Sequence, residues 1–388
     1  MNSPPNRFQD FFDTYTKDLK AEDLQRLFTR DTREAYQFFT RHLDPDELKH
    51  LPWHKRALAY THAVFLAFTM KLSPARRVVF GASLLLALIG LINLFTTFGL
   101  YRIIDFPFGG GVGVPGPMFH RGTWSLLFAF ALMNLLVLLE VADRLSLKND
   151  LEIAREIQQA MLPSGQFSRP GVEIVGFSRP ANTVGGDFYD ILPLDDGRVV
   201  VTVGDVSGKG SPAALLMALL LAILRTLVDE KLEAAELVTR LNLQVSRHTP
   251  GSRFITLFYG VYDPVSGVMT YVNAGHTQPL VLRHDGRFQR LTEGGIALGM
   301  FEQSKYQTGH VAIQPDELLA IYSDGITEAE DAKERPFDES GLEQVLAANR
   351  TLDISAVATA VVQTVERHTI DTRISDDLTI LLLRRRLQ

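Results

Sequence analysis

The sequence predicts an α+β fold in which helices and an antiparallel β-sheet form layers, preceded by an α-helical hairpin and further N-terminal helices. After Gly165, short β-type runs follow one another closely along the chain. Helices interrupt these runs in two blocks instead of alternating with them, which is typical of antiparallel sheets covered by helices. Two long uncharged runs before residue 142 predict the hairpin.

Composition excludes several classes of function. The chain has 388 residues, of which 46% are hydrophobic and 22% charged, and this length allows two or three structural units. The net charge of −6 and the lack of a long basic run make nucleic acid an unfavourable partner. The absence of cysteine excludes disulfides, thiol nucleophiles and cysteine metal sites. The polar N-terminus predicts no cleavable signal peptide.

Residues 1–72 are interpreted as an N-terminal helical region. Phe8, Phe11, Phe12 and Tyr15 recur at helical spacing, and the acidic, proline-containing segment 44–47 is typical of a helix start. The apolar stretch 57–72 is too short for a membrane span and predicts an interfacial or packed helix. A regulatory or packing module is favoured over a ligand-binding sensor.

Residues 73–142 are predicted to form a two-helix transmembrane hairpin. The run 78–101 contains no charge, and its roughly 24 residues can cross a bilayer core of about 30 Å. The run 123–139 is shorter and can extend to Ala142 if Glu140 snorkels or packs. The Gly/Pro-rich segment 106–122 between them predicts a loop. The alternative is a buried pair of helices in a soluble protein, which the length of the first run disfavours.

The distribution of basic residues predicts the orientation. The loop between the two runs offers only Arg102 and Arg121. The flanks carry more positive charge, from Lys55, Arg56, Lys71, Arg76 and Arg77 on one side and Arg144 and Lys148 on the other. The positive-inside rule therefore places both termini in the cytoplasm, in a multi-pass protein of the bacterial inner membrane with lipid around the hairpin.

Residues 143–163 are predicted to form a helical linker. No Gly or Pro occurs from Glu140 to Met161, and apolar residues keep an approximate heptad spacing that Arg144 and Gln158 interrupt. This pattern predicts a short coiled coil and hence a homodimer. The alternative is a single amphipathic helix that docks on the following domain.

Residues 164–388 are predicted to form one layered domain. Its β-type runs are 172–177, 198–203, 255–262, 268–273, 318–322 and 378–383, and its helical stretches are 211–249 and 339–367. The apolar run 215–224 lies in the first helical stretch and is too short to span a membrane.

Four acidic segments lie beside the ends of predicted strands. They are 185–190 with Asp187 and Asp190, 204–210 with Asp205, 322–325 with Asp324, and 375–377 with Asp376 and Asp377. Three have glycine next to the acid, which lets the backbone turn and the carboxylates point into a shared site. Mg²⁺ and Mn²⁺ prefer such oxygen ligands, whereas the lack of histidine-rich spacing disfavours zinc. Any one segment alone could be a turn, and 204–209 has the wrong glycine spacing for a phosphate-binding P-loop.

Two further stretches complete a family resemblance: the helical segment 151–163, and 273–280 with His276. With the acidic segments, they make residues 151–385 resemble the bacterial PP2C-type (PPM) serine/threonine phosphatases of the stage II sporulation protein E and RsbU group. The resemblance implies a four-layer α/β/β/α sandwich and hydrolysis of phosphoserine or phosphothreonine with two Mn²⁺ or Mg²⁺ ions. It implies metal ligation by Asp187, Asp205, the Val206 carbonyl, Asp324 and Asp376.

The remaining candidates carry less weight. Asp190 and Asp377 are weaker ligand candidates that can instead orient their neighbours, and a structural role is favoured for His276 over proton donation. By analogy with the family, the substrate is a phosphorylated anti-sigma factor antagonist or a similar partner-switching protein. The alternative function is a catalytically silent, phosphatase-like signalling adaptor in the membrane.

Overall fold

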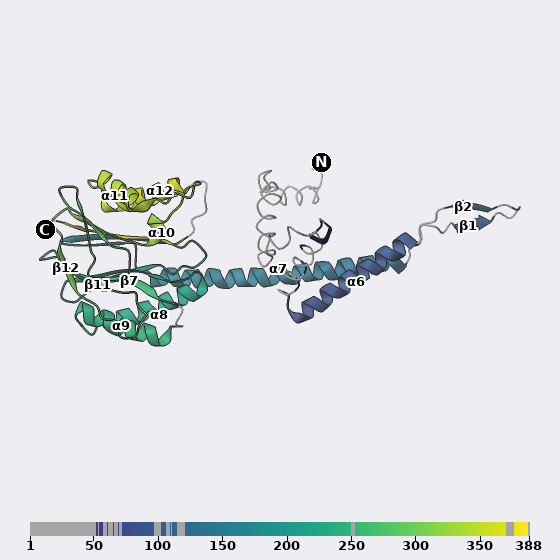
Figure 1. Ribbon diagram of the computed structural model, residues 1–388, viewed down its shortest axis with the longest axis horizontal. Helices are drawn as coiled ribbons and strands as arrows, with labels where there is room; N and C mark the ends of the chain where they lie inside the picture. The colour runs from purple at the N-terminus through teal and green to yellow at the C-terminus, as the bar shows by residue number, and fades with distance from the viewer. Residues whose placement is uncertain are drawn as a thin grey trace, which may run out of the picture. The chain divides into compact units, whose positions relative to one another are not determined.

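The computed structural model of the chain describes residues 52, 54–56, 60, 65, 69, 72–96, 102–105, 109, 111–114, 121–249, 253–369 and 376–386. The chain divides into two compact units, Met1–Leu145 and Ser146–Gln388 (Figure 1). The predicted helical signals at Phe8 to Tyr15 and at 44–47 lie outside the described residues. The bounds of the four predicted domains remain predictions.

The first unit contains an antiparallel pair of apolar helices. These are α6 (Pro74–Thr96) and α7 (Arg121–Met161), which continues into the second unit. Arg76 at the start of α6 forms ion pairs with Glu140 at 3.3 Å and with Asp143 at 2.8 Å. The N-terminal end of α6 therefore lies beside residues 140–143 of α7, as a hairpin requires.

The connection between α6 and α7 contains a short β-ribbon. Strands β1 (Arg102–Asp105) and β2 (Gly111–Val114) pair antiparallel with each other. The prediction of a plain loop over 106–122 was wrong for β2. Its alternating glycines gave no strand signal, because glycine weakens a strand and supplies no side chain to pack.

By length and composition, three of the described helices are apolar enough to cross a membrane: the segments Pro74–Asn93, Thr123–Met161 and Ser211–Val228. Large apolar side chains on the first two are exposed, among them Leu85 and Phe130. The third is α8 (Ser211–Val228), which is longer than the apolar run considered from the sequence. Its Leu220, Leu221 and Leu224 are fully buried in the C-terminal domain, so this helix is a core element there.

The C-terminal end of α7 docks on the domain that follows it. Gln158 is buried, and Met161 packs against the domain core. Leu147, Ile153 and Ile157 of the same helix are exposed. The structure thus supports docking for the last turns of the helix and leaves apolar side chains of α7 uncovered.

The strands of the second unit form two sheets. One has the order β10-β9-β13-β14-β4-β3, and the other has the order β11-β8-β7-β6-β5 with β12 also paired to β8. The first sheet contains β3 (Gln166–Arg169), β4 (Val172–Arg179), β9 (Leu280–Leu282), β10 (Phe288–Arg290), β13 (Leu318–Tyr322) and β14 (Leu378–Arg385). The second contains β5 (Phe188–Pro193), β6 (Val199–Val206), β7 (Ile255–Asp263), β8 (Val268–Ala274), β11 (Gly294–Gly295) and β12 (Gly309–Ala312).

Neighbouring strands pair antiparallel except for β11, which pairs parallel with β8. The two predicted helical stretches are each two helices: α8 with α9 (Ala234–His248), and α11 (Asp338–Ala348) with α12 (Ile354–His368). A short helix, α10 (Asp324–Thr327), follows β13.

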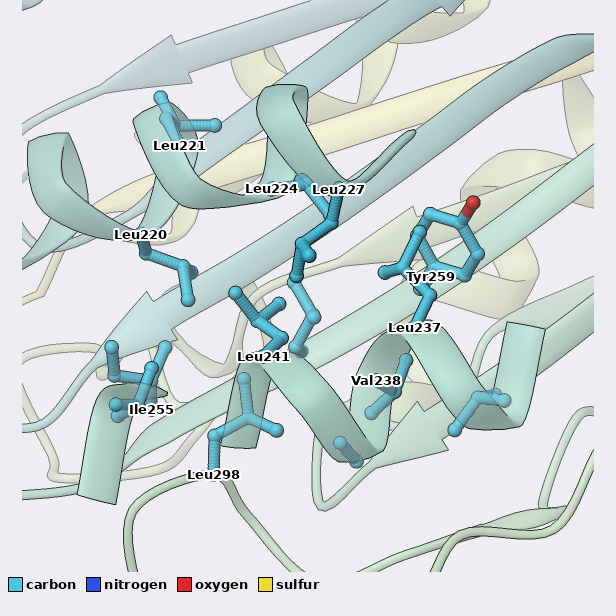
Figure 2. Close-up of a cluster of buried hydrophobic side chains, with 14 of the residues drawn as sticks. Leu220, Leu221, Leu224, Leu227, Leu237, Val238, Leu241, Ile255, Tyr259 and Leu298 are labelled. Carbon is cyan, nitrogen blue, oxygen red and sulfur yellow. The ribbon is translucent and has the colours of Figure 1, made fainter. Parts of the chain in front are cut away.

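Three apolar layers hold the domain together. Side chains from α8 and α9 pack against the β5-to-β8 sheet, where Leu220, Leu241 and Ile255 meet (Figure 2). A second cluster fills the space between the two sheets, and a third lies between α11, α12 and the β13–β14 sheet. In Figure 1 the two helix pairs accordingly lie on opposite sides of the strands. The four-layer α/β/β/α sandwich is confirmed.

The core between the sheets gives the first prediction. Leu381 of β14 is fully buried there, opposite Ile321 in the strand register. Leu381→Ala leaves a cavity in this close-packed layer, so we expect the free energy of unfolding to fall by about 2–5 kcal/mol. Urea unfolding of a soluble fragment 149–388 measures the change. Val265→Ala, at a side chain 78% exposed, is the control and should shift it by less than about 0.5 kcal/mol. Equal midpoints for the two variants would contradict the layer assignment.

Candidate active site

The acidic segments meet because they follow or precede strands that are neighbours in each sheet. In one sheet, Phe188 of β5 pairs with Gly204 of β6, which brings Asp187 and Asp205 to the same end of the two strands. In the other, Tyr322 of β13 pairs with Ile380 of β14, and the two strands are antiparallel. Asp324 after β13 therefore lies near Asp376 and Asp377, which precede β14.

Asp377 joins the two pairs across the sandwich. Its Oδ2 accepts hydrogen bonds from the backbone N–H of Gly186 at 2.7 Å and of Asp187 at 3.3 Å. Its Oδ1 accepts a third from the N–H of Ala181 at 2.7 Å. Asp377, which precedes β14 of one sheet, thus holds the loop that precedes β5 of the other sheet. Asp377, a weak ligand candidate from the sequence, is in the structure an organiser of the site.

Glycine is required where these segments touch. A Cβ at Gly185 would lie 2.2 Å from Asp377 Oδ2, and a Cβ at Gly325 would lie 2.1 Å from the Asp377 carbonyl oxygen. At Gly186 a Cβ would lie 2.8 Å from the carbonyl oxygen of Val206. The missing side chains allow backbone and carboxylates to approach to distances that any other residue would prevent.

The carboxylates raise one another's pKa. Burial, followed by the charges of Asp205 and Asp377, raises the pKa of Asp187 well above its usual value. Burial, followed by Asp324, raises the pKa of Asp205 to about 6. Burial and then Asp376 raise that of Asp324. The site therefore concentrates negative charge where water is partly excluded, and this arrangement is unfavourable without a positive partner.

Positive charge inside the site is limited. Lys209 forms an ion pair with Asp376, with Nζ 2.8 Å from Oδ2, and also lowers the pKa of Asp324. The side chains of Lys209 and Asp376 are 52% and 41% exposed, so this pair is partly solvated. Asp187 Oδ2 is buried and has no hydrogen-bond partner among the residues that the structure describes. The positive charge near these carboxylates is thus smaller than their combined negative charge.

A hard divalent cation fits this donor set by its chemistry. Carboxylate and carbonyl oxygens are the ligands that Mg²⁺ and Mn²⁺ prefer, and the orphaned Oδ2 of Asp187 is such a donor. No group of three or more His, Asp or Glu side chains among the described residues forms a ready-made ligand cluster. The carboxylates share one region but do not converge on a single position, as expected for like charges that repel one another.

Two further candidates from the sequence are engaged by side chains other than the four acidic ligand candidates. Asp190 is buried and accepts a 2.8 Å hydrogen bond from Arg225 Nε, in an ion pair that also ties the region to Met161 at the end of α7. His276 is buried, its Nδ1 lies 2.9 Å from the Thr256 hydroxyl, and burial lowers its pKa to about 4. Its imidazole is therefore neutral at pH 7, in agreement with the structural role favoured from the sequence.

Sequence reasoning missed two residues that shape the site. Gln158 of α7 donates from Nε2 to the Gly185 carbonyl at 2.8 Å and accepts from the Gly185 N–H at 3.2 Å. Its only signal was a polar residue within an apolar heptad pattern. Lys209 was noted only as part of a false P-loop, and nothing in the sequence indicated its pairing with Asp376.

Comparisons with known proteins agree with this geometry. Residues 195–386 match the family model for Stage II sporulation protein E (SpoIIE). Protein IcfG of Synechocystis is 30% identical over 252 residues, covering 58% of this chain and 40% of its own length. Phosphoserine phosphatase RsbU of Bacillus subtilis is 26% identical over 245 residues, which is 62% of this chain and 71% of that protein.

Solved structures show the same fold. The RsbU and RsbW domains of a Mycobacterium tuberculosis protein superpose with a TM-score of 0.50 at 27% identity, over 56% of this chain and 60% of that chain. The C-terminal domain of this chain is therefore similar to the PP2C-type domains of the SpoIIE and RsbU group. The SiaA-PP2C domain of Pseudomonas aeruginosa, at 21% identity and a TM-score of 0.55, covers 63% of this chain and 98% of that domain, and shows the shared PP2C-type fold.

The raised pKa of Asp205 makes the stability of the metal-free PP2C-type domain depend on pH. The folded-state pKa is about 6 and the usual value is 3.8, so the folded protein holds this proton more tightly than the unfolded chain does. Its contribution to stability is present below about pH 4 and is lost as pH rises through about 6.

We therefore expect Asp205→Asn to stabilise the domain in EDTA at pH 8, by on the order of 2 kcal/mol, and to change little at pH 4. Thermal unfolding at the two pH values measures this. An equal effect at both would show that charge repulsion is not the cause.

Asp376 and Asp377 are adjacent but should respond differently to substitution. Asp377→Ala leaves two short hydrogen bonds to the backbone unmade, so we expect a loss of about 2–4 kcal/mol, partly offset by relief of repulsion on Asp187. Asp376→Asn removes a half-exposed ion pair and should cost at most about 1 kcal/mol. Urea unfolding of both variants in EDTA gives the comparison. Similar losses would refute the organising role of Asp377.

Proposed function

We propose that the PP2C-type domain is a metal-dependent protein phosphatase that hydrolyses phosphoserine or phosphothreonine. The observation that carries this proposal is the gathering of Asp187, Asp205 and Asp324 at one end of both sheets, with each carboxyl pKa raised. The similarity to the SpoIIE and RsbU group supports it, because RsbU of Bacillus subtilis is a phosphoserine phosphatase.

In this proposal two Mn²⁺ or Mg²⁺ ions are held by Asp187, Asp205, the Val206 carbonyl, Asp324 and Asp376. When bound, the ions supply Lewis-acid activation of water and of the phosphoryl group. Asp377 holds the Gly186 backbone against Val206 and so keeps Asp187 beside Asp205. Lys209 must release Asp376 for this carboxylate to serve as a ligand. Neutral His276 keeps its bond to Thr256 and takes no part as an acid.

The proposed substrate is a phosphorylated anti-sigma factor antagonist or a similar partner-switching protein. This rests on the likeness to RsbU of Bacillus subtilis, which at 26% identity covers 71% of that protein. The chain spans only 40% of the length of the Synechocystis relative, so the activity and partners of that whole protein are not transferred to it.

The N-terminal part is proposed to place the enzyme at the bacterial inner membrane and to carry a signal. The exposed apolar faces of α6 and α7 suit lipid contact, with both termini in the cytoplasm. The exposed Ile153 and Ile157, one turn apart on α7, suit a homodimer along this helix. Gln158 then connects the same helix to Gly185, two residues from Asp187, so a change in helix packing has a direct route to the site.

Two observations favour a second candidate, a catalytically silent adaptor. Asp376 is engaged by Lys209, and the described carboxylates do not form a complete ligand cluster. A domain that binds a phosphoprotein partner without turnover would tolerate both features.

Hydrolysis of p-nitrophenyl phosphate and of a phosphothreonine peptide separates the two candidates. The full chain and fragment 149–388 are assayed with and without Mn²⁺. We expect metal-dependent hydrolysis that falls by about 100-fold or more in Asp205→Asn and in Asp324→Asn, because each loses part of the metal site. Asp196→Asn, at an exposed turn carboxylate paired with Arg198, is the matched control and should keep full activity.

Folded protein with no activity and no Mn²⁺ binding by calorimetry would overturn the phosphatase proposal and leave the adaptor. Activity in the full chain but not in a folded fragment would instead show that the membrane half is part of the active state.

A further inference from the structure

A second charged site lies at the other end of the β13–β14 sheet. A pocket there is lined by Arg283, Arg350, Arg384 and Arg386, together with Asp316 and Thr351. We call it the arginine pocket. It is built from the ends of β9, β13 and β14 and from the turn between α11 and α12.

The arginine pocket is remote from the acidic site. Asp377 precedes β14 and Arg384 lies near its end, seven residues along an extended strand. At about 3.3 Å per residue, this places the two roughly 23 Å apart. The pocket is therefore not a part of the proposed catalytic centre.

Two of the arginines have carboxylate partners. Arg283 Nη1 forms an ion pair with buried Glu317 and donates to the Ala312 carbonyl at 2.7 Å. Arg386 pairs with Glu173 at 2.9 Å, and its other terminal nitrogen lies 3.9 Å from Asp316. These contacts hold the walls of the pocket and offset part of its charge.

Arg384 and Arg350 have no carboxylate partner among the residues that the structure describes. Arg384 is only 4% exposed, donates to the carbonyls of Leu352 and Arg350, and keeps a buried Nε without any hydrogen-bond partner. Burial, followed by the charge of Arg386, lowers its pKa. The exposed Arg350 makes one long contact, 3.4 Å, with the His284 carbonyl. The charges of Glu173, Asp316 and Asp353 act in the opposite sense but do not outweigh these two causes. A buried guanidinium that makes no ion pair is unfavourable, so the pocket is complementary to an anion.

We propose that the arginine pocket binds a phosphate-sized oxyanion. Guanidinium groups present planar pairs of donors that match the oxygens of a phosphoryl group. Arg350 is the accessible guanidinium, and Arg386 must share its donors with Glu173. The Thr351 hydroxyl is a further donor, and buried Arg384 adds positive charge. Asp316 is the one carboxylate in the lining, and it limits the pocket to modest affinity. The same chemistry would accept inorganic phosphate or the phosphomonoester of a phosphorylated residue.

Calorimetry on the full chain in detergent micelles with EDTA tests the proposal, since EDTA prevents phosphate from binding through a metal. We expect saturable binding of inorganic phosphate with a dissociation constant on the order of 1 mM. Arg350→Gln and the double variant with Arg386→Gln should weaken it by about tenfold or more. Arg367→Gln, an exposed arginine of α12 outside the pocket, is the matched control and should bind as the unaltered protein does.

The same titration with phenyl phosphate distinguishes the sources. Tighter binding of the ester than of phosphate would assign the pocket to a phosphorylated residue, and equal or weaker binding would assign it to free phosphate. The proposal is overturned if no saturable heat appears up to about 10 mM ligand, or if Arg350→Gln and the double variant bind as well as the control. Neither result depends on phosphatase activity, so failure of the proposed function would not affect this test.

Discussion

The carboxylate of Asp377 is the contact on which the site depends. The two sheets of the sandwich are held mainly by apolar packing, which fixes their separation but not the position of individual loops. Asp377 accepts N–H bonds from Ala181 and Gly186, and so ties the loop before β5 to the start of β14. This contact fixes Asp187 on one sheet relative to the segment that carries Asp376 on the other.

Such a contact is compatible only with an unusual local sequence. Gly185 and Gly186 must lack a Cβ for the loop to reach Asp377 and Val206. The carboxylates so assembled repel one another, as the raised pKa values of Asp187, Asp205 and Asp324 show. The apolar layers around the site stabilise the domain enough to hold this arrangement. A bound cation would relieve the repulsion, which is why the same residues that weaken the metal-free fold are the proposed ligands.

The sequence predicted the main strands and the two helical blocks because these elements have strong local signals. Residues 318–322 were predicted as a strand, and β13 has these same bounds; β4, β6, β7, β8 and β14 begin at or within one residue of prediction. Strands β9 to β12 are two to four residues long and carry too little alternation to detect, since their pairing depends on neighbours remote in sequence. The acidic residues were found because glycine and aspartate at strand ends mark a turn that exposes a carboxylate.

What the sequence could not reveal was the partner of each polar side chain. In the sequence, Gln158 is only a polar residue that interrupts a heptad pattern. In the structure, its side chain both donates a hydrogen bond to the Gly185 carbonyl and accepts one from the Gly185 N–H.

That pair of bonds also constrains how a signal could reach the site. Met161, at the end of the same helix, accepts a hydrogen bond from Arg225, and Arg225 binds Asp190, so the helix end is tied to β5 at both ends of the segment 185–190. The segment 185–190, which carries Asp187, is therefore bound to the end of α7 at one side and to Asp377 at the other. Any change in how α7 packs on the domain acts on contacts that lie within two residues of Asp187.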